Sequence, residues 1–186
     1  MTLKKLVAFI YIVLSLISMP INADSTQERR IIISTLIFPR LIAVDQNLTD
    51  KLDESGNVRI GIIYHSNIDK AKKVDRLISR KIKKIAAENI TIDYIDINRI
   101  NQLENKPYSG FFIAQLMSKS DISRIIQFSN KHNILNFSPF EGDVERGIIA
   151  SIFIGAKIKP YFNIKSLVKA GVSLKPALLR VSKVYE

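Results

Sequence analysis

The stretch that most constrains the fold is Val58–Tyr64, with the sequence Val-Arg-Ile-Gly-Ile-Ile-Tyr. It is rich in β-branched residues and almost continuously apolar, which is typical of a strand buried on both faces of a parallel sheet. A helix is predicted over 68–88, because apolar residues recur there on one face and Lys and Arg on the opposite face. A second strand is predicted over 90–96. Together they make one β-α-β unit, whose crossover should be right-handed.

The rest of the chain alternates helices and strands in a similar way. The other predicted elements are, in chain order, a helix over 30–47 that is interrupted near Pro39, a loop over 50–57, a strand over 111–114, a helix from Ser118 or Ser120 to about 131, strands over 134–137, 147–154 and 158–163, and helices over 164–170 and 173 to about 184. This order predicts a single α/β domain with a mostly parallel sheet flanked by helices. The last two strands are close enough in sequence to form an antiparallel hairpin at one edge.

The N-terminus has the pattern of an export signal. Lys4 and Lys5 precede an apolar run over 6–19, and Pro20 and the small residue Ala23 follow it. This order of charge, apolar core and small residue is typical of a secretory signal peptide. The apolar run of about 14 residues is short of the roughly 20 that cross a bilayer. We therefore expect residues 1–23 to be a signal peptide and 24–186 to be the exported domain; an uncleaved anchor is the alternative.

The absence of cysteine and the positive net charge limit the sites and partners that the exported domain can have. The chain has no cysteine, which excludes disulfides, zinc–thiolate sites and cysteine nucleophiles. Lys4 and Lys5 are the only charged residues of the predicted signal peptide, so its removal lowers the net charge from +11 to +9. A basic exported protein can contact anionic lipid head groups or acidic partners. The alternative is a solvated, lysine-rich surface. Nucleic acid is not an expected partner, because aromatic residues do not interleave the basic ones.

No residue pattern indicates catalysis or a metal. His65 and His132 adjoin predicted strands, and neither has a carboxylate at metal-ligand spacing in the sequence. Asp93 and Asp96 lie at the end of a predicted strand, where acid–base chemistry is conceivable but solvated carboxylates are far commoner. We expect a protein that is not an enzyme and that needs neither metal nor cofactor.

Several short segments carry a family resemblance. They are Ile134–Ser138, Gly147–Ile149, Lys159–Ile164 and Ala170–Ser173 with Leu178-Leu179 downstream, joined more loosely by Val44–Leu48 ahead of the strand at 58–64. In this order they resemble the YfiR/HmsC family of periplasmic regulatory proteins. The chain lacks that family's aromatic N-terminal helix with its Trp-Pro ending, and also its cysteines. Redox-dependent regulation therefore does not carry over.

The resemblance implies a function and a partner. It implies a periplasmic protein that represses a membrane-bound diguanylate cyclase by binding its periplasmic part, and so controls cyclic di-GMP and biofilm formation. The implied partner is an inner-membrane protein with a periplasmic domain, and a homodimer is a further option. Candidate binding residues at element ends are Ser138, Gly147, Asn163 and Ser173. Helix capping is the structural alternative for Asn163 and Ser173. A periplasmic solute-binding lobe that serves a transporter or sensor is the alternative function.

Overall fold

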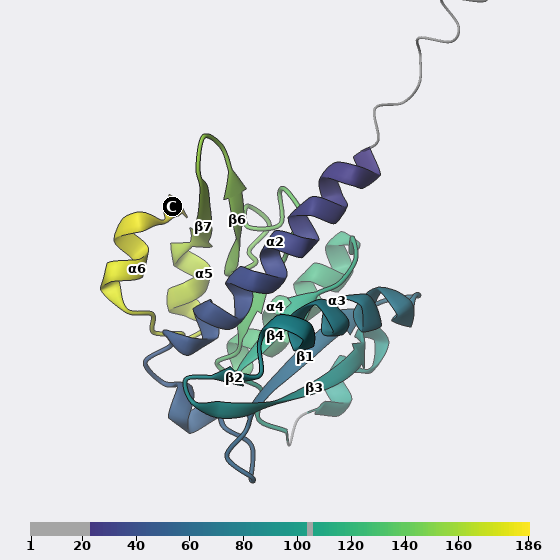
Figure 1. Cartoon of the computed structure of the whole chain (residues 1–186), viewed down its shortest axis with the longest axis vertical. Helices are drawn as coiled ribbons and strands as arrows, with labels where there is room; N and C mark the ends of the chain where they lie inside the picture. The colour runs from purple at the N-terminus through teal and green to yellow at the C-terminus, as the bar shows by residue number, and fades with distance from the viewer. Residues whose placement is uncertain (1–22, 104–105) are drawn as a thin grey trace, which may run out of the picture.

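The computed structural model describes residues 23–103 and 106–186 (Figure 1). The predicted signal peptide lies outside the described residues except for Ala23, the first residue of a helix. The strands are β1 (Val58–Tyr64), β2 (Lys84–Ile85), β3 (Glu88–Asp96), β4 (Gly110–Ile113), β5 (Leu135–Phe137), β6 (Ala150–Ile154), β7 (Ile158–Asn163) and β8 (Lys183–Tyr185).

The eight strands form one sheet in the order β2-β3-β1-β4-β5-β6-β7-β8. The five strands from β3 to β6 pair in parallel, whereas β2 is antiparallel to β3 and β7 is antiparallel to β6. The predicted α/β class with a mostly parallel sheet is confirmed. The predicted antiparallel hairpin is β6–β7, and β8 adds a further strand outside it, parallel to β7.

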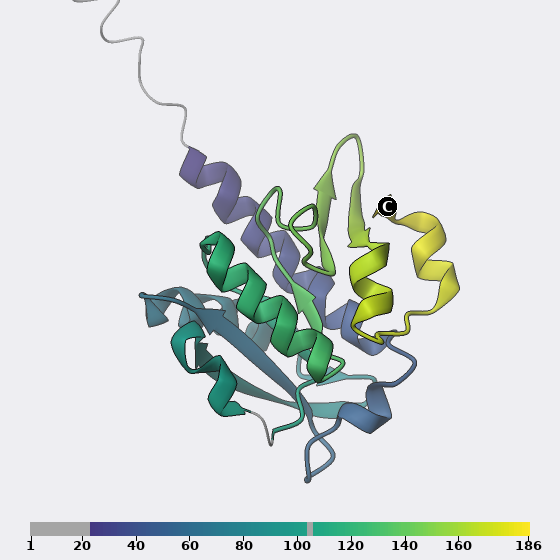
Figure 2. The same ribbon diagram turned by 180° about the vertical axis from the view of Figure 1, so that it is seen from behind.

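Helices cover both faces of the sheet. They are α2 (Ala23–Ala43), α3 (Ile68–Lys81), α4 (Lys119–Lys131), α5 (Ile164–Lys169) and α6 (Pro176–Val181), with 3-10 turns η1 (Leu48–Lys51) and η2 (Ile97–Leu103). Helices α2 and α3 lie side by side on the face toward the viewer in Figure 1, and α4 covers the opposite face, seen in Figure 2. The sheet is therefore the middle layer of a three-layer domain.

Strand β1 is buried on both faces, as its sequence predicts. Ile60 and Ile62 belong to the core beneath α2 and α3, whereas Ile63 belongs to the core beneath α4. Gly61 sits between them because a side chain would not fit. A Cβ there would lie 2.3 Å from Cδ1 of Ile95. The absence of a side chain thus permits close packing of the α4 layer against the centre of the sheet.

The helix predicted over 68–88 is too long, since α3 ends at Lys81. A tight turn at Ala86 and Ala87 follows, with positive φ angles of 50° and 77°, and it joins β2 to β3 as a hairpin. Two consecutive residues with positive φ suit the right-handed twist of a hairpin. Asn-Gly or Asp-Gly usually marks such a turn, so Ala-Ala gives no signal in the sequence.

The predicted break near Pro39 does not occur. Helix α2 runs continuously through Pro39, and it begins and ends earlier than the predicted range of 30–47. Pro39 has no N–H to donate to the carbonyl of Thr35, one turn earlier. We attribute the continuity to the full burial of Phe38 and Ile42 on both sides of the proline, which holds this part of the helix against the sheet.

Two further element boundaries differ from the prediction. Strand β6 begins at Ala150 and not at 147, because Gly147 has a positive φ of 106° and ends a series of turns. The helix predicted from Ser173 is the shorter α6, which is preceded by Lys175 at its N-cap and followed by β8. Ser173 therefore does not cap the last helix.

Candidate functional site

The strand order places a crevice beside β1. The chain passes from β1 to β3 on one side of it and then returns to β4 on the other side. The connections therefore diverge at the carboxyl ends of β1 and β4, and open α/β sheets bind ligands at such a reversal. A cleft of about 230 Å³ lies there. Its lining comes from α2, α3, the end of β4 and the segment after β5: Gln27, Glu28, Ile31, Lys70, Lys73, Val74, Ala114, Gln115, Leu116 and Phe140.

Two polar features lie in this cleft. Lys73 donates a hydrogen bond from Nζ to Oε1 of Glu28, which links α3 to α2, and this bond lowers the pKa of the Glu28 carboxyl. The side-chain oxygen of Gln115 is buried and accepts no hydrogen bond within the described residues. A buried acceptor left without a donor is unfavourable. An N–H or O–H group placed in the cleft would satisfy it.

Three of the four predicted binding residues meet at the loop between β5 and β6. Ser138 donates from Oγ to Oδ2 of Asp143, at 2.5 Å. Asn163 donates from Nδ2 to the carbonyl of Val144, at 2.8 Å, and the Gly147 N–H donates to the same carbonyl, at 3.0 Å. Ser138 and Asn163 are buried, so they hold the shape of this loop and do not line the cleft.

Asn163 also has the capping role that its position predicts. Its Oδ1 accepts a hydrogen bond from the Ser166 N–H, at 2.9 Å, at the first turn of α5. Ser173 lies apart from the other three residues. It pairs with Gln46, donating from Oγ to Oε1 and accepting at its carbonyl from the Gln46 N–H, both at 2.7 Å. Ser173 thus joins the segment after α5 to the segment after α2.

Arg30 is a site residue that sequence reasoning missed. Its side chain is 7% exposed and donates from Nε to the carbonyl of Pro139, at 2.7 Å, and from Nη2 to that of Ile152, at 3.0 Å. Nη1 pairs with Oε1 of Glu141, at 2.9 Å. Arg30 therefore ties α2 to the β5–β6 loop and to strand β6. Its partners are more than a hundred residues away in sequence, so no local pattern could identify it.

Burial also changes the pKa of a carboxyl group in this loop, that of Asp143. The pKa of Asp143 is raised above the ordinary 3.8 because the carboxyl is buried, although the hydrogen bond from Ser138 and the charge of Arg146 oppose the rise. Arg146 Nε lies 3.5 Å from Oδ1 of Asp143. The carboxyl is held inside the loop and is not free to act on a ligand.

A second surface feature is a groove with both polar and apolar lining between α2 and the β6–β7 hairpin. The hairpin and the first turns of α2 both project beyond the rest of the domain in Figure 1. The residues lining the groove, which we call the hairpin groove, are Ser25, Thr26, Arg29, Ile33, Ile154, Gly155, Ala156 and Ile158. Ile154 and Ile158 are 40% and 45% exposed. On α2, Ile32 and Leu36 lie beside Ile33 at helical spacing and are also exposed. The groove thus extends into a larger apolar surface.

The histidines do not build a metal site in the described residues. His65 has a carboxylate partner that is distant in sequence, because its Nδ1 lies 3.3 Å from Oδ2 of Asp121. Asp121 is also paired with Arg124, one helical turn away. His132 stacks on Phe128 with 4.4 Å between the ring centroids. Among the described residues, no three His, Asp or Glu side chains gather as metal ligands.

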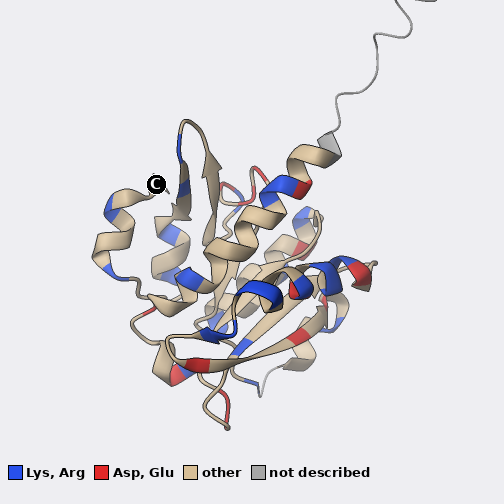
Figure 3. Cartoon of the chain, in the orientation of Figure 1, with Lys and Arg blue, Asp and Glu red and all other residues tan. Residues whose placement is uncertain are grey.

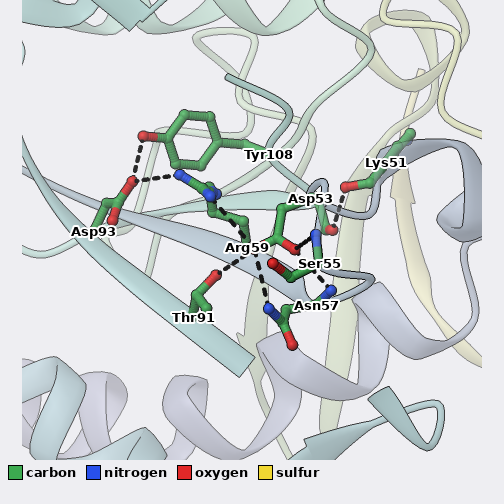
Figure 4. A network of polar contacts seen from close by, with 9 residues as sticks. Lys51, Asp53, Ser55, Asn57, Arg59, Thr91, Asp93 and Tyr108 are labelled. Carbon is green, nitrogen blue, oxygen red and sulfur yellow. Dashed lines mark hydrogen bonds and ion pairs between the residues drawn. The ribbon is translucent and has the colours of Figure 1, made fainter. Parts of the chain in front are cut away.

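A network of polar contacts lies at the opposite, amino end of the sheet (Figure 4). Asp93, one of the two carboxylates considered for acid–base chemistry, accepts a hydrogen bond from the Tyr108 hydroxyl, at 2.8 Å. Arg59 lies between Asp53 and Asp93, at 3.4 Å and 3.5 Å. Burial, followed by this hydrogen bond, raises the pKa of Tyr108. Lys51 and Asp45 form a buried pair at 2.5 Å nearby. These contacts fasten the segment before β1 to β1 and β3.

In residues 23–103 and 106–186, no helix is long and apolar enough to cross a membrane.

Comparisons with known proteins bear on the fold. No family model and no curated protein matches the chain. It is similar to an ABC domain in complex with L-Trp from Streptococcus pneumonia, with 11% identity, 78% of this chain and 62% of that chain covered, and a TM-score of 0.49. It is similar to a conserved domain protein from Vibrio cholerae, with 14% identity, coverages of 75% and 58%, and a TM-score of 0.49.

A third similar structure is a ligand-free, open substrate-binding protein with adhesive properties from Clostridium difficile. The identity is 14%, the coverage is 69% of this chain and 54% of that chain, and the TM-score is 0.52. The chain therefore spans less than two thirds of the length of each of these structures. Over the matched part, the chain shares the α/β fold of this third structure.

Proposed function

We propose that the chain is a periplasmic regulatory binding protein that acts on the periplasmic part of an inner-membrane protein. In this proposal the partner is a diguanylate cyclase, as the resemblance of the C-terminal segments implies, and the protein holds it inactive. It thereby lowers cyclic di-GMP and limits biofilm formation. The protein itself carries out no chemistry, and binding is its whole activity.

The hairpin groove is the observation that carries this proposal. Exposed apolar patches on small domains commonly mark protein-binding sites. Here Ile154 and Ile158 lie opposite each other in the hairpin and remain 40% and 45% exposed. Among the described residues, Arg29 on α2 is the one charged residue that lines the groove. We infer an occupant with an apolar segment and an acidic residue that faces Arg29, since complementary charge favours association with that partner over others.

The test measures cyclic di-GMP in cells that lack the protein. Deletion should raise cyclic di-GMP, and expression of the natural sequence should lower it again. Ile158→Asp should fail to lower it at equal protein level, because a carboxylate would be buried against an apolar partner. Val168→Asp is the matched control: Val168 on α5 is 73% exposed and lies outside the groove, so this variant should work normally. Unchanged cyclic di-GMP on deletion, or normal function of Ile158→Asp, would contradict the proposal.

A solute-binding role is the second candidate, and the cleft beside β1 favours it. The fold is that of a substrate-binding protein over the matched part, and the buried oxygen of Gln115 lacks a donor. A ligand that binds only the folded state raises the melting temperature, and the rise grows with the logarithm of the ligand concentration above its Kd. Screening the twenty amino acids and small carboxylates by thermal unfolding tests this role. A shift that Gln115→Leu abolishes would support it, and no shift with any compound would count against it.

A further inference from the structure

Helix α3 and the segment that leads from it into β2 hold a dense group of positive charges. Residues 70–84 contain eight Lys and Arg residues and a single acid, Asp75. The basic residues, which we call the α3 basic face, are Lys70, Lys72, Lys73, Arg76, Arg80, Lys81, Lys83 and Lys84. All but Lys72 are exposed, and Lys72 is partly exposed. Lys and Arg recur along α3 in Figure 3.

The helical repeat turns most of these charges away from the core. Ala71, Val74 and Ile78 form the buried side of α3. Arg76 and Arg80 are four residues apart and lie on the opposite side of the helix. The positive groups therefore spread over the exposed part of the helix, and Lys73, Arg76, Arg80 and Lys83 gather around one hollow there.

The positive charge is mostly uncompensated within the described residues. The single acid, Asp75, accepts hydrogen bonds from Ser79 Oγ, at 2.6 Å, and from the Tyr94 hydroxyl. Two members of the basic face do pair: Lys72 lies 3.5 Å from Asp69, and Lys73 pairs with Glu28. The other six form no ion pair with any described residue: Lys70, Arg76, Arg80, Lys81, Lys83 and Lys84.

The surface also has a shape suited to head groups. A hollow on α3 is lined by Lys73, Arg76, Leu77, Ser79, Arg80 and Lys83, so four cations surround one leucine. Helix α2 lies beside α3 on the same face of the sheet (Figure 1) and exposes Ile32 and Leu36 to 42% and 37%. Cations next to exposed apolar side chains are typical of surfaces that bind anionic membranes.

We infer that the α3 basic face binds the phosphate groups of anionic phospholipids at a membrane surface. Each Lys or Arg near such a surface adds to the attraction, and the effect falls off within a Debye length. Six unpaired cations on one surface therefore act together. Binding in this way would hold the domain on the membrane with the neighbouring hairpin groove close to membrane-anchored partners. The inference does not depend on the proposed function, because lipid binding needs no protein partner.

Vesicle flotation tests the inference with protein purified from cells that express the whole sequence. The protein should float with vesicles of phosphatidylcholine and phosphatidylglycerol, and not with phosphatidylcholine alone. Arg76→Glu/Arg80→Glu/Lys83→Glu should lower the bound-to-free ratio at least tenfold.

The control Lys165→Glu/Lys169→Glu/Lys175→Glu makes the same change in net charge at exposed positions elsewhere, and it should lower the ratio by about twofold or less. Rising salt should release the natural protein, a result that depends on no variant.

Other outcomes would overturn the inference. Failure of the natural protein to float with the anionic vesicles is one, and an equal loss in both triple variants is another, because the effect would then be one of net charge. Tight binding to duplex DNA that displaces the vesicles and is lost in the Arg76/Arg80/Lys83 variant would assign the surface to nucleic acid. Ile158→Asp should float with the anionic vesicles as the natural protein does. If this variant fails to lower cyclic di-GMP but still floats, partner binding by the hairpin groove and lipid binding by the α3 basic face are separate.

Discussion

The two ends of the sheet use their polar groups differently. At the amino end, Asp53 accepts hydrogen bonds from the backbone of Ser55 and Asn57, at 3.0 Å and 2.9 Å, and Asp93 accepts one from Tyr108. At the carboxyl end, by contrast, the Gln115 oxygen accepts no hydrogen bond from a described residue. The acids of the amino end are therefore taken up by the protein itself, although Nε of Arg59 there has no acceptor among the described residues, whereas the unpartnered Gln115 oxygen of the carboxyl end lines a cleft that a ligand can enter.

Exposed apolar residues follow the same division. The projecting hairpin, which continues from the carboxyl end of β6, carries the exposed Ile154 and Ile158. The amino end instead holds the buried pair of Lys51 and Asp45. From this difference we propose that one end of the molecule serves stability and the other serves binding, in keeping with the general placement of binding sites at the carboxyl ends of parallel strands.

The largest expected effect tests the stabilising role of the amino end. Lys51→Met removes one partner of the buried pair and leaves the Asp45 carboxylate without its cation. We expect a loss of about 3 kcal/mol in the free energy of unfolding, because a buried charge without its partner is strongly unfavourable. Urea unfolding measures it. The control is Lys73→Met in the exposed pair with Glu28, which should leave the unfolding midpoint unchanged. Equal losses in both variants would erase the proposed difference between the two ends.

A smaller effect is expected in the β5–β6 loop. Gly147→Ala forces a side chain onto a residue with φ of 106°, and its Cβ would lie 3.0 Å from Cδ1 of Ile126. We expect it to destabilise the protein by about 2 kcal/mol. Gly142→Ala is the matched control, because Gly142 also has a positive φ, 81°, but has open space around it. Its cost should be about 1 kcal/mol. If thermal unfolding ranks the two variants in the reverse order, crowding against Ile126 is not the cause.

The next effect separates two residues that the sequence singled out together. Asn163→Ala loses the cap of α5 and the bond to the Val144 carbonyl, so we expect a cost of about 1–2 kcal/mol. Ser173→Ala loses only an exposed bond to Gln46, and should cost about 0.5 kcal/mol or less. Chemical denaturation of both variants measures the difference. A cost for Ser173→Ala as large as that for Asn163→Ala would show that the two positions are equivalent.

The smallest expected effect is a dependence on pH. Because the folded-state pKa of Asp143 is raised, the folded protein binds its proton more tightly than the unfolded chain does. Its contribution is therefore fully present below the ordinary pKa of 3.8 and is lost as pH rises through the higher folded value. Asp143→Asn should remove this fall from the pH profile of stability. An unaltered profile in the variant would assign the pH dependence to other groups.

The sequence predicted the centre of the fold better than its edges. Strand β1 is evident from its run of β-branched apolar residues, and the helix after it from one apolar face. The short edge strands β2 and β8 gave no such signal. β8 is exposed throughout and is held by pairing with β7 and by the contact of Lys183 with the ring of Phe153, 3.9 Å from its centroid. Such strands depend on their neighbours and not on their own residues.

The candidate site was predictable only in part, for a related reason. Ser138, Gly147 and Asn163 lie at element ends, and the structure brings them to one loop, whereas Ser173 lies elsewhere. Arg30 and the hairpin groove both join α2 to residues more than a hundred positions later. A periodic pattern identifies which side of a helix is apolar, but it cannot show which distant segment the helix meets.

The most direct test of the central claim is photo-crosslinking in living cells from the two ends of the molecule. A photoreactive amino acid would replace Ile158 in the hairpin groove in one strain, and Ser55, exposed at the amino end, in another. We predict that position 158 crosslinks to an inner-membrane protein with a periplasmic domain and that position 55 does not. Crosslinking to that protein from position 55 alone, or no crosslink from position 158, would contradict the assignment of binding to the carboxyl end.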